Sequence, residues 1–220
     1  MELPDLIKPV YDRISTENRR FPCYTNRASS LGYAVPELNG CLRRGVLSRT
    51  KWEEAEAFDQ AALLRLREGN NQEAIVLRDM AAAGIVLVNQ QEAYEWREYQ
   101  ISGHLDATVI VEGKAVPVEI KSMSPNIFSS VSTFDDLNKK SWLRSYKCQI
   151  TLYQLHKNID KAIMILKDKS SGGLKQLNID LDYQLGEYCI RAAEKINKHV
   201  ADKTLPDRIP DVEILSLIHI

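Results

Sequence analysis

Apolar residues recur at the spacing of one helix face along several stretches of the chain. This spacing predicts helices over residues 4–15, 51–68, 70–83, 141–157 and 182–202. Gly69 is expected to separate the second helix from the third, and Gly84 to take the left-handed conformation that ends a helix. Residues 20–48 are turn-rich, and residues 123–140 form a long loop that we expect to shape the entrance to a site.

Shorter runs of apolar or alternating residues predict strands over residues 85–88, 92–101, 162–166 and 174–179. Between them, residues 103–111 and 115–121 read as the two strands of a β-hairpin. Pro117 lacks an amide donor, so we expect it at the start of its strand or with its nitrogen facing away from the partner. The order of elements predicts an α/β fold with a mixed sheet flanked by helices.

Composition adds limits to this picture. Of the 220 residues, 44% are hydrophobic and 27% are charged, as in globular proteins, so we expect residues 1–220 to form a single domain. No apolar run reaches the length of a membrane span and the N-terminus has no leader pattern, which predicts a cytoplasmic protein. The net charge is -1, whereas many nucleic-acid binders are strongly basic. Arg144 and Lys147 belong to a local basic group that either follows a phosphate backbone or forms a solvated helix face.

The turn of the hairpin decides whether three ionisable residues meet. With a two-residue turn at 112–113, Asp106 lies opposite Glu119. With a turn at 113–114, it lies opposite Lys121 instead. In both registers the three side chains point to one face, because positions two apart on a strand share a face. A three-residue loop would split them across the sheet.

A trio of two carboxylates and one ammonium has a chemical use. Neighbouring carboxylates repel each other and need a cation between them. A divalent ion such as Mg²⁺ prefers oxygen ligands, polarises phosphoryl oxygens and lowers the pKa of bound water. Lys121 would then orient the water or offset charge on a phosphate, so the trio predicts phosphodiester hydrolysis. The alternative is a solvated strand face, but Val116, Val118 and Ile120 around Glu119 indicate a strand that is buried on its other face.

Four short elements resemble the PD-(D/E)XK nuclease superfamily, and within it the RecB-like exonuclease branch, which includes phage exonucleases and CRISPR-associated nucleases. In the family's order they are a Gly-x-x-x-(His/Glu) helix start, a Gly-x-x-Asp strand, a (Asp/Glu)-x-Lys strand and a Gln-x-x-x-Tyr helix. In this chain they are Gly69–Glu73, Gly103–Asp106, Glu119–Lys121 and Gln149–Tyr153. Each is weak alone, and the four in this order are strong. The resemblance covers most of the chain and implies a restriction-endonuclease-like fold.

The resemblance also implies roles for residues. The metal ligands would be Glu73, Asp106 and Glu119, and the catalytic set would be Asp106, Glu119 and Lys121. Gln149 and Tyr153 would contact nucleic acid or support the lysine. Leu105 stands where the superfamily's name has proline, and Glu73 stands where many relatives have histidine. An all-oxygen site favours Mg²⁺ or Mn²⁺ over softer metals.

Some members of this branch hold a 4Fe-4S cluster with one early and three late cysteines. The surroundings of Cys41 resemble those of the early cysteine, but the three late cysteines are absent. Residues 205–210 resemble the lead-in to the missing segment and give way to an apolar tail at 214–220. We therefore hypothesise a truncated or non-native C-terminus, with a cluster only in a longer form of the protein.

These observations predict a metal-dependent DNA nuclease, an exonuclease that acts on DNA ends or single strands. It would serve recombination, phage replication or a CRISPR-related process, together with the proteins of that process. One alternative is a catalytically silent nuclease-like module that binds DNA in EDTA without cutting it. Another is a metal phosphoesterase of small substrates, which an open groove at the site would disfavour.

Overall fold

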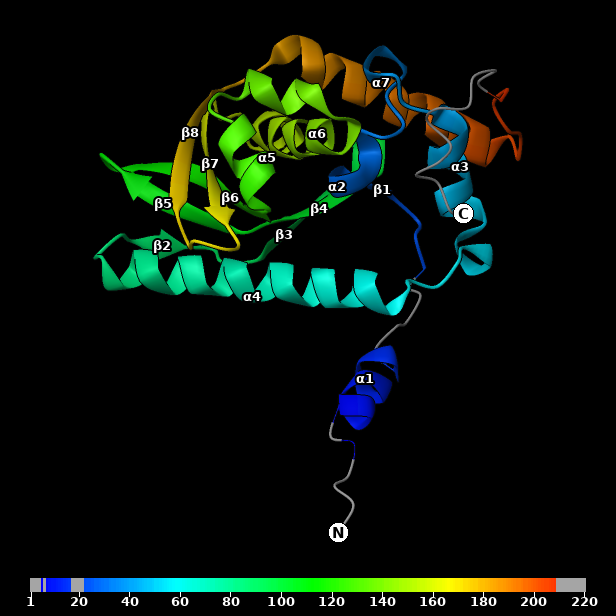
Figure 1. Cartoon of the computed structure of the whole chain (residues 1–220). Helices are drawn as coiled ribbons and strands as arrows, with labels where there is room; N and C mark the ends of the chain where they lie inside the picture. Colours follow the sequence, from blue (N-terminus) through cyan, green and yellow to red (C-terminus); the bar gives the residue numbers. More distant parts are fainter. Residues whose placement is uncertain (1–4, 6, 17–21, 209–220) are drawn as a thin grey trace.

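Two mixed sheets organise the part of the chain that the computed structural model describes, residues 5, 7–16 and 22–208 (Figure 1). The larger sheet has the strand order β2-β5-β6-β7-β8. These strands are β2 (Leu87–Val88), β5 (Ala107–Val111), β6 (Lys114–Met123), β7 (Lys161–Asp168) and β8 (Leu174–Asp180). Strands β6 and β7 run parallel, and the other neighbours run antiparallel. The expected non-native tail at 214–220 lies outside the described residues.

The smaller sheet has the order β1-β4-β3. Its strands are β1 (Asn26–Arg27), β3 (Glu92–Trp96) and β4 (Ile101–Leu105). β3 and β4 are antiparallel, while the short β1 lies parallel to β4. β4 of the smaller sheet directly precedes β5 of the larger sheet, and Asp106 is the single residue between these two strands.

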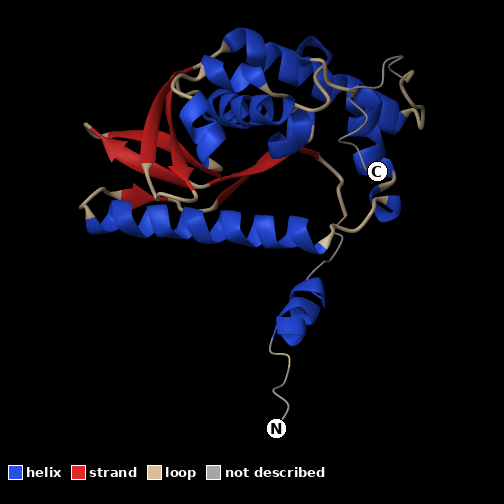
Figure 2. Cartoon of the chain, viewed as in Figure 1, coloured by secondary structure: helices blue, strands red, loops and turns tan. Residues whose placement is uncertain are grey.

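Helices cover both faces of the larger sheet, as the blue and red layers of Figure 2 show. α4 (Gln60–Ala82) lies along one face, and α5 (Pro125–Ser130) and α6 (Ser141–Lys157) lie over the other. α7 (Tyr183–Ala201) packs against α6 and α3 (Leu42–Thr50). The remaining helices are α1 (Ile7–Thr16) and α2 (Ala28–Leu31), with 3-10 turns at Pro36–Leu38, Trp52–Glu54, Arg97–Tyr99 and Asp135–Lys139. Within the described ranges, no helix is both long and apolar enough to cross a bilayer.

Alternation along β6 divides its side chains between two cores. Val118 and Ile120 pack with Val76 and Leu77 of α4. Met123 belongs to the other core, which α6 and α7 build on the opposite face. Because successive side chains on a strand point to opposite faces, Glu119 and Lys121 also lie on the α6 side of β6.

The turn of the hairpin is the two-residue turn at 112–113. Glu112 and Gly113 have φ angles of 50° and 76°, and Val111 pairs with Lys114. Positive φ at both central residues is the mark of a type I′ turn, which suits the twist of a hairpin. Pro117 lies opposite Thr108 at a position whose nitrogen faces away from β5, and pairing with β7 begins only at the next residue.

Two helix predictions around Gly69 were wrong. α4 runs unbroken from Gln60 to Ala82, and residues 51–59 hold only a 3-10 turn and a loop. A glycine inside a helix costs about 1 kcal/mol. Here the cap at Asp59, which accepts a 2.6 Å hydrogen bond from the amide of Ala62, and packing on the sheet offset that cost. The prediction for Gly84 is confirmed by its φ of 81°.

Two strand predictions were also wrong. The chain over 92–101 does not run straight: β3 ends at Trp96, a 3-10 turn follows, and Gln100 with φ 49° reverses the chain into β4. The expected strand over 103–111 is divided at Asp106, where the chain leaves one sheet and enters the other. Periodicity could not show this, because both halves keep the same alternation.

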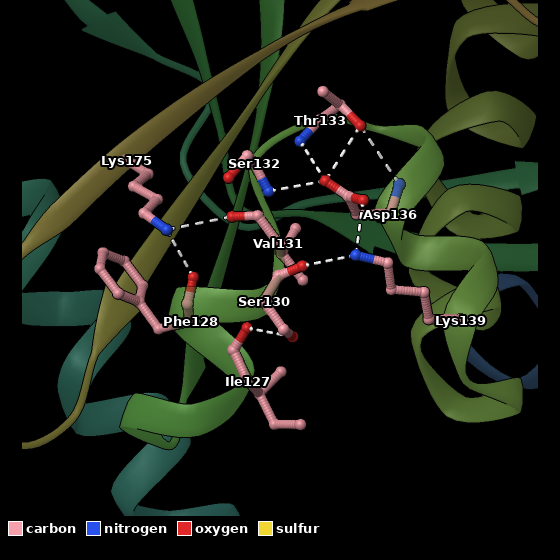
Figure 3. Close-up of polar contacts among 9 residues, drawn as sticks. All are labelled: Ile127, Phe128, Ser130, Val131, Ser132, Thr133, Asp136, Lys139 and Lys175. Carbon is pink, nitrogen blue, oxygen red and sulfur yellow. Dashed lines mark hydrogen bonds and ion pairs between the residues drawn. The ribbon is translucent and has the colours of Figure 1, made fainter.

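The segment 123–140 is more ordered than the loop we predicted. It contains α5 and a 3-10 turn, and the side chains in Figure 3 hold it in place. Lys175 of β8 donates to the carbonyls of Phe128 at 2.6 Å and Val131 at 3.1 Å. Asp136 accepts hydrogen bonds of 2.8 Å from two amides, those of Ser132 and Thr133. The sequence contains no signal for the long-range contacts of Lys175, so a helix breaker such as Pro125 reads as a loop residue.

Candidate active site

The break between β4 and β5 places Asp106 beside the backbone of β6. Ala107 pairs with Val118, so the register expected for a turn at 112–113 is present. The Oδ2 atom of Asp106 accepts a 2.7 Å hydrogen bond from the amide of Ile120. In an unbroken ladder a main-chain carbonyl would take that bond. The Asp106 carboxylate therefore replaces a backbone acceptor where the two sheets part.

Glu119 and Lys121 contact each other on the α6 face of β6. Their side chains form an ion pair between Nζ and Oε1. Glu119 is fully buried, while the side chain of Lys121 keeps 19% of its surface exposed. The lysine is therefore the member of the pair that solvent or a substrate can reach.

Glu73 joins the group from the opposite layer. It lies on α4, one turn before the residues that pack on the sheet, and Gln91 donates a hydrogen bond to its Oε1. The amide of Gln91 also donates to the carbonyl of Asp106 at 3.0 Å, and its side chain bonds the Asp106 carboxylate. Gln91 thus links the helix carboxylate to the strand carboxylate.

The electrostatics show that these groups interact. Burial raises the pKa of Glu119 to about 8, against the opposing effect of Lys121. Burial, and then the nearby carboxylate of Asp106, raises the pKa of Glu73 to about 7. Burial also raises the pKa of Asp106, although Lys121 and the Ile120 amide oppose that shift. Burial would lower the pKa of Lys121, but Glu119 and Asp106 raise it above its ordinary value, so it stays an ammonium at neutral pH.

The donor set has the chemistry of a hard-metal site that is not fully assembled. The Oε2 atom of Glu119 is buried without a hydrogen-bond partner among the described residues. A buried carboxylate oxygen without a partner is costly, and a cation would satisfy it. Within the described ranges, no three Asp, Glu, His or Cys side chains already converge as metal ligands do. Glu73, Asp106 and Glu119 are the residues that would hold an ion, and their carboxylate oxygens are ligands that fit Mg²⁺ or Mn²⁺.

Gln149 and Tyr153 lie on α6 but make different contacts from those expected. The Nε2 atom of Gln149 donates to the carbonyl of His104 at 3.4 Å, which places it next to the strand break. Tyr153 is 3% exposed, and its hydroxyl donates to Glu92 at 3.1 Å. Among the described residues Tyr153 thus contacts Glu92 and Tyr94 of β3, and the expected role of Gln149 and Tyr153 in binding nucleic acid or supporting Lys121 stays a prediction.

Arg144 and Lys147 lie on another side of α6. Arg144 donates to the carbonyl of Leu38 at 2.9 Å. Lys147 is 4% exposed and pairs with Asp135 at 3.2 Å. Both line a cavity of about 190 Å³ that the start of α7 helps to close. The residues that line this cavity do not include Asp106 or Glu119. Contact of Arg144 and Lys147 with a phosphate backbone therefore stays a prediction.

Cys41 is buried just before α3. The three late cysteines are absent from the sequence, so the iron–sulfur hypothesis, which concerns a longer form of the protein, stays a prediction. Cys148 and Cys189 are both fully buried, and a hydrogen bond between the two thiols, followed by burial, raises the pKa of the Cys189 thiol.

Sequence reasoning missed three residues of the site. Gln91 bridges two carboxylates from a turn and carries no motif. Tyr94 of β3 has a buried hydroxyl that finds no partner among the residues the structure describes, and its pKa is raised first by burial and next by Glu119. Tyr146 of α6 lies with its ring 5.2 Å from Nζ of Lys121. Tyr146 precedes Gln149 by three positions, so the two share a face of α6. That spacing was a signal in the sequence that could have pointed to Tyr146.

A polar cavity of about 450 Å³ leads to this group. It is lined by Asp106, Gln149 and residues of the two segments 22–29 and 102–104. Arg27, Ser29 and Ser102 give it hydrogen-bond donors, so a phosphate-bearing chain could reach Asp106 from this side.

No family model matches the chain, and no curated protein matches it either. Solved structures do share its fold. An alkaline exonuclease from Laribacter hongkongensis aligns over 87% of this chain and 93% of its own, with a TM-score of 0.56 and 10% identity. The complex of that exonuclease with dAMP aligns over 81% and 89%, with a TM-score of 0.52 and 13% identity. A phage-related exonuclease from Haemophilus somnus 129PT aligns over 85% and 99%, with a TM-score of 0.51 and 15% identity. The chain therefore has the predicted restriction-endonuclease-like fold, a mixed sheet flanked by helices, which these exonucleases share.

Proposed function

We propose that the protein is a divalent-metal-dependent deoxyribonuclease, an exonuclease that acts on DNA ends or single strands. The observation that carries the proposal is the group at the strand break, in which the buried Asp106 and Glu119 lie with the half-buried Glu73 and Lys121. It supports the proposal because three carboxylates with raised pKa values lie beside a lysine that stays protonated. The fold that holds them is shared with exonucleases. DNA is the substrate we infer, since one related exonuclease was solved with dAMP.

Each residue has a distinct task in this mechanism. Glu73, Asp106 and Glu119 would hold Mg²⁺ or Mn²⁺ through carboxylate oxygens. When bound, the ion supplies positive charge for a phosphoryl oxygen and makes water a better nucleophile near neutral pH. Lys121 keeps its proton, so it acts as a hydrogen-bond donor that orients the attacking water and offsets charge on the phosphate, not as a base. Gln149 holds α6 against the strand break through the His104 carbonyl.

The test is cleavage of end-labelled single- and double-stranded DNA with Mg²⁺, with Mn²⁺ and in EDTA. We expect cleavage with either metal and none in EDTA. Asp106→Asn and Lys121→Ala should each reduce kcat by about 100-fold or more, because each removes charge that acts on the transition state. Lys114→Ala, at the exposed start of the same strand, is the matched control and should cleave as the unchanged protein does.

Two results would contradict the proposal. Cleavage that persists in Asp106→Asn and Lys121→Ala would point to a contaminating nuclease. DNA binding in EDTA without cleavage by any metal would favour the silent binding module. The biological setting we propose is the processing of DNA ends, as in recombination, phage replication or a CRISPR-related process.

A further inference from the structure

Lys121 has a long side chain that must be aimed. A lysine stem has four rotatable bonds, and freezing it costs up to about 2 kcal/mol of conformational entropy. Two neighbours hold its ammonium here: Oε1 of Glu119 on one side and the ring of Tyr146, 5.2 Å from Nζ, on the other. The first neighbour comes from its own strand and the second from α6.

Tyr146 is itself held firmly. Its ring meets the ring of Trp142 edge to face, with centroids 5.9 Å apart and planes at 79°. It also lies near Tyr33, whose own ring faces the guanidinium of Arg44 at 4.4 Å. Its contact with Lys121 is made by the face of this ring, whose centre lies 5.2 Å from Nζ.

The helix that carries Tyr146 is fixed against the site. Gln149, three positions later, bonds the His104 carbonyl at 3.4 Å beside the strand break. Any displacement of α6 along the sheet would break this bond and move the ring away from Lys121. Tyr153, one turn beyond Gln149, is instead bonded to Glu92 and meets the ring of Tyr94 at 5.4 Å.

We propose that Tyr146 is the positioning residue for Lys121, and that its ring face, not the Tyr153 hydroxyl, aims the ammonium at the reacting phosphate. A ring face attracts a cation without accepting a directional N–H bond. Of the three N–H donors of the ammonium, one is used by Glu119, and two stay available for water and phosphate. The contact rests on the geometry alone, while its consequence for cleavage rests on the proposed function.

Activity tests the consequence. Tyr146→Phe keeps the ring and should retain kcat within about 2-fold. Tyr146→Leu keeps the apolar bulk but removes the ring, and should lower kcat by about 10-fold while the KM for DNA stays nearly constant. Tyr99→Leu changes another half-buried tyrosine, in the 3-10 turn between β3 and β4; it controls for loss of an aromatic residue and should leave kcat unchanged. Equal loss in Tyr146→Phe and Tyr146→Leu, or no loss in either, would overturn the proposal.

Nuclear magnetic resonance tests the contact without any cleavage. In metal-free protein labelled with ¹³C-lysine, the ε-protons of Lys121, assigned from Lys121→Arg, should show an upfield ring-current shift. The shift should remain in Tyr146→Phe and in Tyr153→Leu and disappear in Tyr146→Leu. A shift that persists in Tyr146→Leu would overturn the placement. If the unchanged protein cleaves no DNA, the proposed function fails, and these spectra still decide whether Tyr146 holds the lysine.

Discussion

At the scale of single residues, the site is a set of carboxylates that the fold holds in an unfavourable state. Glu119 is fully buried, and one of its oxygens lacks a partner among the described residues. Glu73 and Asp106 add negative charge nearby, and Lys121 is the cation that offsets them. Such a group costs stability and is retained where charge does chemical work.

This arrangement predicts that the metal-free protein loses stability between pH 6.5 and 8.5. The pKa values of Glu73 and Glu119, about 7 and about 8, lie above the ordinary value of 4.5. In this window the unfolded chain has already lost both protons and the folded chain still binds them, so rising pH favours unfolding. We expect a loss on the order of 2 kcal/mol, measured as the urea midpoint in EDTA.

Other groups do not reverse the sign in this window. The raised pKa of Lys121 keeps its contribution constant below its ordinary value of 10.5. His156 has a pKa lowered by burial from 6.5, so it opposes the trend only at lower pH. Glu119→Gln should flatten the pH dependence, whereas Glu187→Gln on the exposed face of α7 should not. Stability that stays level or rises from pH 6.5 to 8.5 would contradict this account.

At the scale of secondary-structure elements, α4 shows how packing overrides a local break. It spans 23 residues with a glycine in its interior, and it ends at a glycine in the left-handed conformation. The length lets one helix cover the sheet and also carry Glu73 to the strand break.

The two glycines of this helix should respond in opposite directions to alanine. A Cβ at Gly69 would meet nothing within 4 Å, so Gly69→Ala should stabilise the protein by about 0.5–1 kcal/mol through helix propensity. Gly84 has φ 81°, so Gly84→Ala should destabilise it by about 1 kcal/mol. Thermal unfolding measures both. A loss of stability in Gly69→Ala would show that the helix needs flexibility at that position.

The segment of α5 and the following 3-10 turn depends on one lysine. Lys175 bonds two carbonyls of the segment and lies 4.3 Å from the centre of the Phe128 ring (Figure 3). Hydrogen bonds to a charged group contribute about 1.5–3 kcal/mol each at most. Lys175→Ala should therefore speed amide hydrogen exchange in residues 127–136 by about 10-fold or more, since 1.4 kcal/mol is a factor of ten. Lys114→Ala, an exposed lysine of the same sheet, should leave these amides protected.

At the scale of the whole molecule, the site exists because two sheets part at one residue. The five-stranded sheet lies between α4 on one face and α6 on the other (Figure 1). Asp106 stands where β4 leaves, Glu119 and Lys121 come from the neighbouring strand, and Glu73 comes from the helix below. Glu73 thus meets Asp106, Glu119 and Lys121 from far away in the sequence, because α4 and the strands pack against each other.

The sequence predicted much of this arrangement. The helix over 141–157 has the same bounds in the structure, and the turn at 112–113 gives one of the registers that local geometry allowed. These features depend on short-range periodicity and turn chemistry, which neighbouring residues specify. Parity along the hairpin also brought Asp106, Glu119 and Lys121 together, whereas Glu73 was named only through the family resemblance.

Only the tertiary structure decided which residues surround them. A strand that changes sheet at Asp106 keeps its alternation, so no local pattern marks the change. Gln91 and Tyr146 reach the site through chain reversal and helix packing, which depend on contacts between residues far apart in sequence. Local rules therefore determined the elements and the chemistry on each, while long-range packing decided that Lys121 faces Tyr146 and that Tyr153 faces Glu92.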